Sequence, residues 1–90
     1  MHTSRLRRAQ DALFRSAGGD VYLAAADREG FDRLSGSAAT AWMLLDEGPT
    51  FAELVRELAS LHDATAEEIE PEIRSLLDEL VRRGWVWESA

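Results

Sequence analysis

The 90-residue sequence contains no cysteine and no lysine. The first absence excludes disulfides, thiolate metal sites and cysteine nucleophiles, and the second excludes Schiff-base catalysis by a lysine amine. The uninterrupted apolar runs are only a few residues long, whereas a membrane span needs roughly 20. The N-terminus also lacks the apolar stretch of a secretory signal. We therefore expect a cytoplasmic chain that has no membrane partner.

Groups able to carry out catalysis or bind a metal are also scarce. The sequence has two histidines, His2 and His62. His62 lies beside Asp63, but no further ligand follows at helical spacing, and a solvated position at a helix end is the more ordinary interpretation. The short glycine-containing stretches lack the spacing of a phosphate-binding loop. We predict no enzymatic activity, no cofactor and no metal.

Charge is distributed unevenly along the chain, whose formal net charge is −7. The first 20 residues carry four arginines against two acids, whereas the remaining 70 carry six arginines against fifteen acids. An acidic body disfavours binding to phosphates. We expect residues 1–11 to be a flexible basic tail, residues 12–87 to be one folded domain and residues 88–90 to be a C-terminal tail.

The first half of the domain has the pattern of short strands. Residues 12–16, 21–25 and 31–34 are separated by turn signals at Gly18-Gly19 and at residues 27–30. Two successive hairpins predict a three-stranded antiparallel sheet.

The second half has the pattern of three helices. Ser35 is a candidate N-cap for the first helix. Thr50–Glu53 and Thr65–Glu68 have the pattern of capping boxes, and apolar residues follow each at helical spacing. Pro71 interrupts the third helix, so we expect that helix to begin near Glu70 after a separate turn. Trp42 continues a core stripe, Trp85 is expected at the bottom of the core, and residues 85–87 are expected to be extended.

Three segments in this order resemble the PqqD-like family, whose members are called RiPP recognition elements. They are the stretch Leu34–Asp46, which contains Trp42-Met43-Leu44-Leu45-Asp46, the helix start Pro49–Leu54, and the ending Ile73–Gly84. The resemblance covers roughly residues 12–86. The chain departs from the family at Trp85, where a leucine is common, and at Ser35, where an asparagine is common.

This resemblance implies an α+β, winged-helix-like fold: a three-stranded antiparallel β-sheet followed by three α-helices. It also implies a non-catalytic function, in which the leader segment of a ribosomally made precursor peptide binds as an added strand along the third strand, beside the third helix. A short strand at a sheet edge supports that location independently, because its backbone groups are available for pairing. The predicted leader-binding residues are Phe31, Asp32, Arg33, Leu34, Arg74, Leu77, Asp78 and Val81.

Each of these residues also has a purely structural interpretation. Leu77 and Val81 belong to the helix's core stripe, Arg74 and Asp78 can form a surface pair, and Phe31 can close the sheet. Trp87 is a candidate for contact with a partner protein.

Two other functions fit parts of the pattern. The last two helices imitate a helix-turn-helix of a DNA-binding regulator, but acidic side chains on the would-be recognition helix oppose that function: Glu67, Glu68, Glu70, Glu72, Asp78 and Glu79. A plain protein–protein module that ignores leaders would use the same edge strand. Within the leader-binding class, the resemblance favours a lasso-peptide system with a separate cysteine protease over a PqqD-type partnership with a radical SAM enzyme.

Overall fold

A computed structural model describes residues 4–89, which form a three-stranded antiparallel sheet, three helices and a separate two-stranded ribbon. The predicted α+β fold is therefore confirmed. In chain order the elements are β1 (Arg5–Arg8), β2 (Leu13–Ala17), β3 (Asp20–Ala24), β4 (Asp32–Leu34), α1 (Ser37–Leu44), a 3-10 turn (Leu45–Glu47), α2 (Phe51–Leu61), α3 (Ala66–Arg82) and β5 (Val86–Ser89).

The three-stranded sheet has the order β2-β3-β4. Gly18 and Gly19 both have positive φ angles, which glycine adopts at little cost, and they close the tight turn between β2 and β3. β3 lies in the centre, and its inward side chains Val21 and Leu23 are buried. One face of the sheet therefore contributes to the core.

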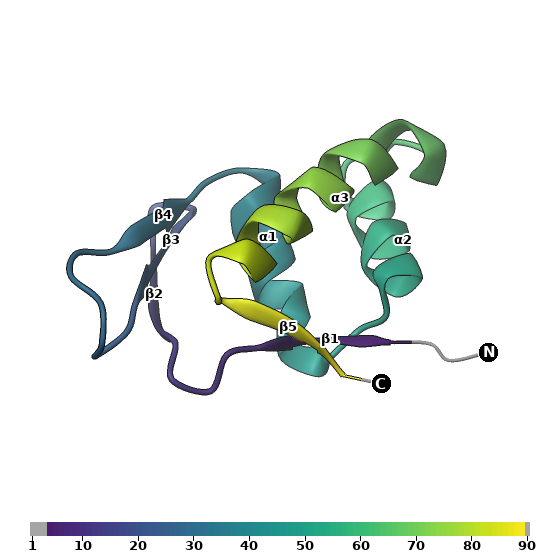
Figure 1. The fold of residues 1–90 in the computed structure, drawn as a ribbon. Helices are drawn as coiled ribbons and strands as arrows, with labels where there is room; N and C mark the ends of the chain where they lie inside the picture. Colours follow the sequence, from purple (N-terminus) through teal and green to yellow (C-terminus); the bar gives the residue numbers. More distant parts are fainter. Residues whose placement is uncertain (1–3, 90) are drawn as a thin grey trace.

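The helices cover only that inner face, and Figure 1 shows the sheet at one end of the molecule with α2 at the other. α1 lies next to the sheet, and α3 runs between α2 and the strands. Trp42 of α1 is fully buried and Trp85, after α3, is 2% exposed, as the sequence predicts. Strands and helices thus share one core, whose largest buried side chains include Trp42, Leu23, Leu54, Leu58 and Ile73.

The two predicted capping boxes are confirmed before α2 and α3, whereas the predicted cap of α1 is not. Thr50 accepts a hydrogen bond from the Glu53 backbone N–H at 3.1 Å, and the Glu53 carboxylate accepts one from the Thr50 N–H at 2.9 Å. Thr65 and Glu68 form the same reciprocal pair. The prediction that Ser35 caps α1 is wrong, because Gly36 occupies the N-cap position with φ 60° and no side chain caps the helix.

The expectation that the third helix begins near Glu70 is wrong. α3 begins at Ala66, directly after the Thr65 cap, and continues through Pro71 to Arg82. The capping box starts the helix upstream, and the packing of Ile69 and Ile73 against the core holds the first turns together. These interactions outweigh the hydrogen bond that proline cannot donate.

The expectation of flexible ends is wrong for the residues that the structure describes there. Arg5–Arg8 form β1, which pairs antiparallel with β5, and β5 takes in Glu88 and Ser89. Leu6 is 2% exposed, and its backbone N–H donates to the Pro49 carbonyl at 2.8 Å. Residues 1–3 and 90, which belong to the same predicted tails, lie outside the described residues. β1 and β5 therefore pair with each other as part of the folded domain (Figure 1).

Candidate functional site

β4 is an edge strand, as predicted. It pairs with β3 on one side, and no other strand within residues 4–89 pairs with its second side. Alternate backbone N–H and C=O groups along this second side can therefore pair with an added strand.

The side chains of β4 alternate between the two faces of the sheet. Asp32 and Leu34 pair in register with the buried residues Leu23 and Val21, so they lie on the inner face. Leu34 is partly buried against the core. The Asp32 carboxylate accepts a hydrogen bond from the Trp85 indole N–H at 2.7 Å.

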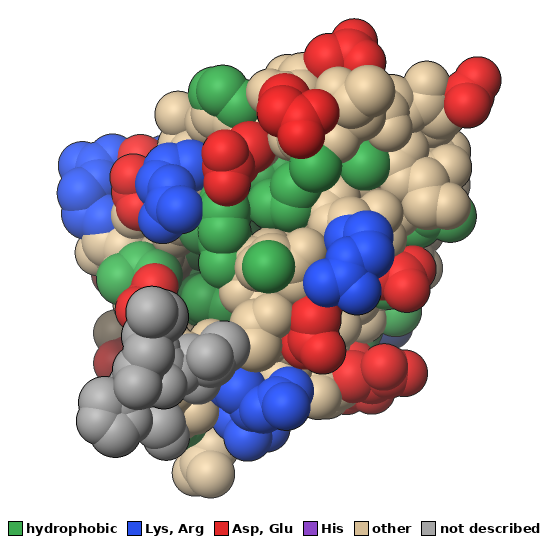
Figure 2. Space-filling view, turned by 90° about the vertical axis from the view of Figure 1, so that its right-hand side faces the viewer, with side chains coloured by type: hydrophobic (Ala, Val, Ile, Leu, Met, Phe, Trp, Pro, Cys, Tyr) green, Lys and Arg blue, Asp and Glu red, His purple; other side chains and the backbone are tan. Residues whose placement is uncertain are grey.

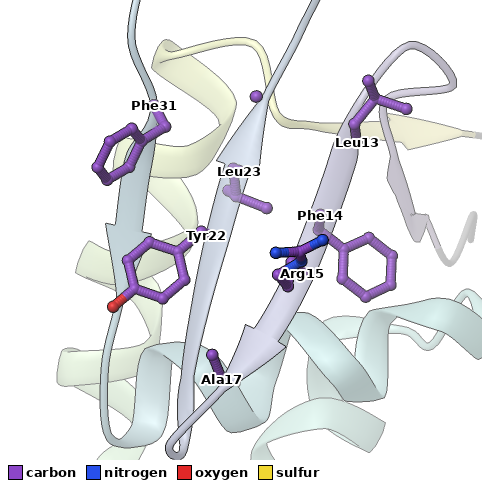
Figure 3. Close-up of a pocket in the computed structure, with 8 residues that line it drawn as sticks. Leu13, Phe14, Arg15, Ala17, Tyr22, Leu23 and Phe31 are labelled. Carbon is purple, nitrogen blue, oxygen red and sulfur yellow. The ribbon is translucent and has the colours of Figure 1, made fainter.

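Arg33 and Phe31 lie on the outer face instead. Arg33 forms an ion pair with Asp20 at 2.8 Å. The Phe31 ring lies 5.6 Å from the Tyr22 ring in an edge-to-face arrangement, and Phe31 is 66% exposed. Figure 3 shows Phe31 and Tyr22 side by side on this face. The four residues predicted on the strand are thus divided between two faces.

Two contacts identify the side of α3 that faces β4 and α1. Arg83, at the C-terminal end of α3, forms an ion pair with Asp32 at 3.2 Å. Nearer the start of the helix, the Ser37 hydroxyl of α1 is hydrogen-bonded to Glu72 at 3.1 Å. Leu76 and Glu79 lie on the same side, because positions 72, 76, 79 and 83 recur at helical spacing. This row therefore faces β4 at its Arg83 end and α1 at its Glu72 end.

An acid–base chain connects β4 to this end of α3. Glu79 is hydrogen-bonded to Arg82 and Arg83, and these bonds hold the pKa of Glu79 below its ordinary value. The hydrogen bonds to Glu79, followed by those to Asp32, raise the pKa of Arg83. The ion pairs of Arg83 with Glu79 and with Asp32 therefore link the end of α3 to β4.

The structure places the other predicted helix residues elsewhere. The Arg74 guanidinium lies 4.0 Å from the centre of the Phe51 ring, so this side of α3 faces α2. Asp78 and Val81 follow Arg74 at helical spacing and share that side. Leu77 is 5% exposed and belongs to the core. Arg74, Asp78 and Val81 therefore lie on a different side of α3 from the row that ends at Arg83, and Leu77 is part of the core.

Glu72, Leu76, Glu79 and Arg83 are the residues that the sequence analysis missed. The helical stripe in the sequence identifies the core side of α3, but its two flanks look alike in charge. Only the tertiary contacts of Asp32 and Ser37 distinguish the flank beside the sheet from the flank beside α2.

A hollow lies at the other end of the same row, beside the start of α1. It is lined by Ile69 and Ile73, with polar groups at its rim from Ser37, His62 and Glu72. Glu72 belongs to both the row and the hollow.

The α2 and α3 side of the molecule does not have the charge of a nucleic-acid surface. Figure 2 shows acidic and arginine side chains interspersed there, around a strip of hydrophobic side chains. On α3 the exposed acids include Glu67, Glu70 and Asp78. Carboxylates at these positions repel phosphates, so the surface does not favour DNA binding.

Trp87 is 48% exposed on β5, where it pairs in register with Arg7.

No group of three histidine, aspartate or glutamate side chains within residues 4–89 is arranged to hold a metal ion. In the same part of the chain, no helix combines the length and the apolar character required to cross a membrane.

Comparison with known proteins identifies a matching family model and solved structures of similar fold. The family model described as coenzyme PQQ synthesis protein D (PqqD) matches residues 21–86. The solved structure of TbiB1 in complex with the TbiA(beta) leader peptide is similar with a TM-score of 0.83, covering 93% of this chain and 98% of TbiB1 at 18% identity. A search of curated proteins found no match.

Proposed function

Because the chain belongs to the PqqD family, we propose that it is a non-catalytic recognition element that binds the leader segment of a ribosomally made precursor peptide. The observation that carries this proposal is the edge of β4, which is open to pairing and lies beside α3. The similar fold of TbiB1, whose structure is a complex with a leader peptide, supports it.

In the proposed mechanism the leader adds to β4 as a fourth strand. Each backbone hydrogen bond contributes about 0.5–1.5 kcal/mol net and is insensitive to the leader's sequence. Because β4 is only three residues long, these bonds alone supply modest affinity. Side-chain contacts beside the strand must supply the rest of the affinity and the specificity.

The side chains of the added strand alternate between two environments. Those pointing inward meet Leu34 and the row of α3 that faces β4, where Leu76 offers an apolar contact and Arg83 and Glu79 offer charges. Those pointing outward lie beside Phe31 and Arg33. We therefore retain the strand residues of the predicted site and replace Arg74, Asp78 and Val81 with Glu72, Leu76, Glu79 and Arg83.

The inner environment indicates which leaders fit. Leu34 and Leu76 favour one apolar or aromatic anchor, and a second anchor fits the hollow at Ile69 and Ile73. The opposite charges of Asp32 and Arg83 already neutralise each other. A leader side chain beside this pair should therefore be polar and uncharged, because it can then form hydrogen bonds without adding an unpaired charge.

We propose further that the bound leader is delivered to a separate enzyme. The enzyme is a cysteine protease in a lasso-peptide system, or a radical SAM enzyme in a PqqD-type partnership. The genes beside the chain's own gene distinguish the two, because a precursor gene accompanies a protease and a cyclase in the first case.

Titration of the isotope-labelled chain with the leader encoded beside its gene tests the mode of binding. We expect saturable shifts of the backbone amides of β4 and slowed hydrogen exchange there, because new inter-strand bonds protect these groups. Saturable shifts confined to β5 or α2 would contradict strand addition at β4 while leaving leader binding intact.

The Phe31→Asp substitution tests the outward contact. Phe31 is mostly exposed, so we expect the melting temperature to stay unchanged while the dissociation constant of a fluorescent leader rises about tenfold. Leu61→Asp, at a residue of α2 that is 60% exposed, is the matched control and should bind normally. Normal leader binding by Phe31→Asp would remove Phe31 from the site.

A further inference from the structure

The outer face of the three-stranded sheet is unusually apolar for a surface that no helix covers. Leu13 and Phe31 are 65% and 66% exposed, the highest values among the exposed large hydrophobic residues of the described chain. Tyr22 lies between the strands that bear them, and Figure 3 shows all three around a shallow hollow. The solvent side of an antiparallel sheet is normally polar, so this surface is a candidate interface.

The hollow extends across β2 and β3 to Phe31, the residue that precedes β4. Leu13 pairs with Ala24 in one row of the sheet, and Phe31 lines the same hollow. The next row aligns Arg15, Tyr22 and Arg33. An apolar row thus borders a row with a central aromatic ring and a cation on each side.

The charge of this outer face is opposite to that of the chain. Of its two arginines, Arg33 is paired with Asp20, whereas Arg15 has no acidic group within ion-pair distance in residues 4–89. The face therefore has a positive character on a chain of net charge −7. A complementary surface has an apolar patch bordered by carboxylates.

We propose that the outer face of the sheet docks the enzyme that acts on the leader-bound precursor, through an apolar patch with acidic margins on that enzyme. This inference rests on the proposed function, because a leader added to β4 extends the same sheet. The outward side chains of the leader then join this face beside Phe31 and Arg33. An enzyme docked on the face meets the leader at its edge, and the two ligands bind without competing.

The leader does not fill this face by itself. Neighbouring strands lie about 4.8 Å apart, so a strand added beside β4 is three strand spacings from β2, roughly 14 Å. Its outward side chains reach Phe31 but not Leu13 or Arg15. A second copy of the chain fits less well, because self-contact would bring two positive faces together.

Two substitutions on β2 test the proposal away from the leader edge. Leu13→Asp removes apolar contact, and Arg15→Glu reverses the charge. Leu61→Asp and Arg56→Glu on α2 are the matched controls. For each folded variant, leader affinity is measured by fluorescence anisotropy. Affinity for the purified enzyme encoded beside the chain's gene is measured by surface plasmon resonance, with and without leader.

We expect Leu13→Asp to raise the dissociation constant for the enzyme about tenfold or more while leader affinity stays unchanged. Arg15→Glu should slow association and weaken its dependence on salt, because it removes the attractive charge. Both α2 controls should behave like the parent chain.

Enzyme affinity that is unchanged in both β2 variants overturns the docking proposal and leaves leader recognition intact. Concentration-dependent self-association of the parent chain that Leu13→Asp abolishes also overturns it, because the occupant is then a second copy. If the parent chain binds no leader but loses enzyme affinity through Leu13→Asp, the docking surface stands and the proposed function fails.

Discussion

Arg8 of β1 contacts residues of β2, of α1 and of the 3-10 turn that follows α1. Its guanidinium donates to the backbone carbonyls of Trp42 and Met43 at the end of α1 and forms an ion pair with Asp46 at 3.2 Å. The same group lies 4.7 Å and 4.9 Å from the centres of the Phe14 and Trp42 rings. Burial lowers the pKa of Arg8 and Asp46 opposes that effect, but an arginine remains charged in either case.

The substitution Arg8→Lys tests this arrangement. A lysine ammonium keeps the charge but cannot form the planar, multiply bonded contact or stack between two rings. We expect the free energy of unfolding to fall by about 1–3 kcal/mol, measured by urea denaturation. Arg7→Lys is the matched control, because Arg7 is exposed, with one side-chain hydrogen bond at 3.5 Å, and should change stability little. Equal losses in both variants would contradict a special role for Arg8.

Asp32 shows why a residue predicted to bind a ligand can also be structural. Its carboxylate holds Trp85 and Arg83 in place, so its replacement would change the core as well as the site. Leader-binding measurements on Asp32 variants therefore need a parallel measurement of stability. Phe31 is a cleaner position, because its only ring contact within the described chain is with Tyr22.

At the scale of elements, the two capping boxes are the clearest local determinants. They set the starts of α2 and α3 through hydrogen bonds that span three residues. The hydrogen bond from the Thr50 backbone N–H lowers the pKa of Glu53, and the corresponding bond from Thr65 lowers that of Glu68. Both carboxylates must therefore be ionised for the caps to contribute fully.

Thr50→Ala should lower the free energy of unfolding by about 1 kcal/mol, because the N-terminal N–H groups of α2 lose their acceptor. Urea denaturation followed by circular dichroism measures the change. Thr40→Ala, the same substitution inside α1, is the matched control. It should cost less, since alanine is the better helix former at an interior position.

The capping boxes also predict a dependence on pH. The folded-state pKa of Glu53 lies below its ordinary value of 4.5. The contribution of Glu53 to stability is therefore complete above pH 4.5 and is lost as the pH falls through the folded-state pKa. Glu53→Gln should accordingly lose less stability than the parent chain between pH 6 and pH 3. An identical loss in both proteins would argue against the capping role.

At the scale of the whole molecule, the β1–β5 ribbon joins both ends of the chain to the core. β1 pairs with β5 on one side and contacts Pro49 and Thr50 on the other. Leu6 and Val86 are each 2% exposed. The ribbon is therefore part of the folded domain.

Deletion of residues 1–8 tests whether the N-terminal segment is structural. The deletion removes the buried Leu6 side chain, worth about 2 kcal/mol, the Arg8 contacts and the pairing partner of β5. A chain of this size has a total stability of roughly 5–13 kcal/mol. We expect strong destabilisation and loss of cooperative urea unfolding. Deletion of residues 1–4, which leaves β1 complete, is the control. A neutral result for both deletions would restore the flexible-tail interpretation.

The sequence by itself determined the elements whose signals are local. Capping boxes, helical stripes and the Gly18-Gly19 turn act over three to five residues, and each predicted its element correctly. The order of these elements supported the family resemblance, and the resemblance predicted the fold. The absence of cysteine and lysine excluded disulfides, thiolate chemistry and Schiff-base catalysis by a lysine.

Only the tertiary structure decided the features that depend on distant partners. β1 has a single large apolar residue, Leu6, so no local pattern predicts a strand, and its pairing with β5 joins residues at opposite ends of the chain. The flanks of α3 look alike in the sequence, because periodicity identifies the core side and nothing more. One flank of α3 packs against β4 and the other against α2. Arg83 therefore lies at the candidate site, whereas Arg74 lies beside Phe51 of α2.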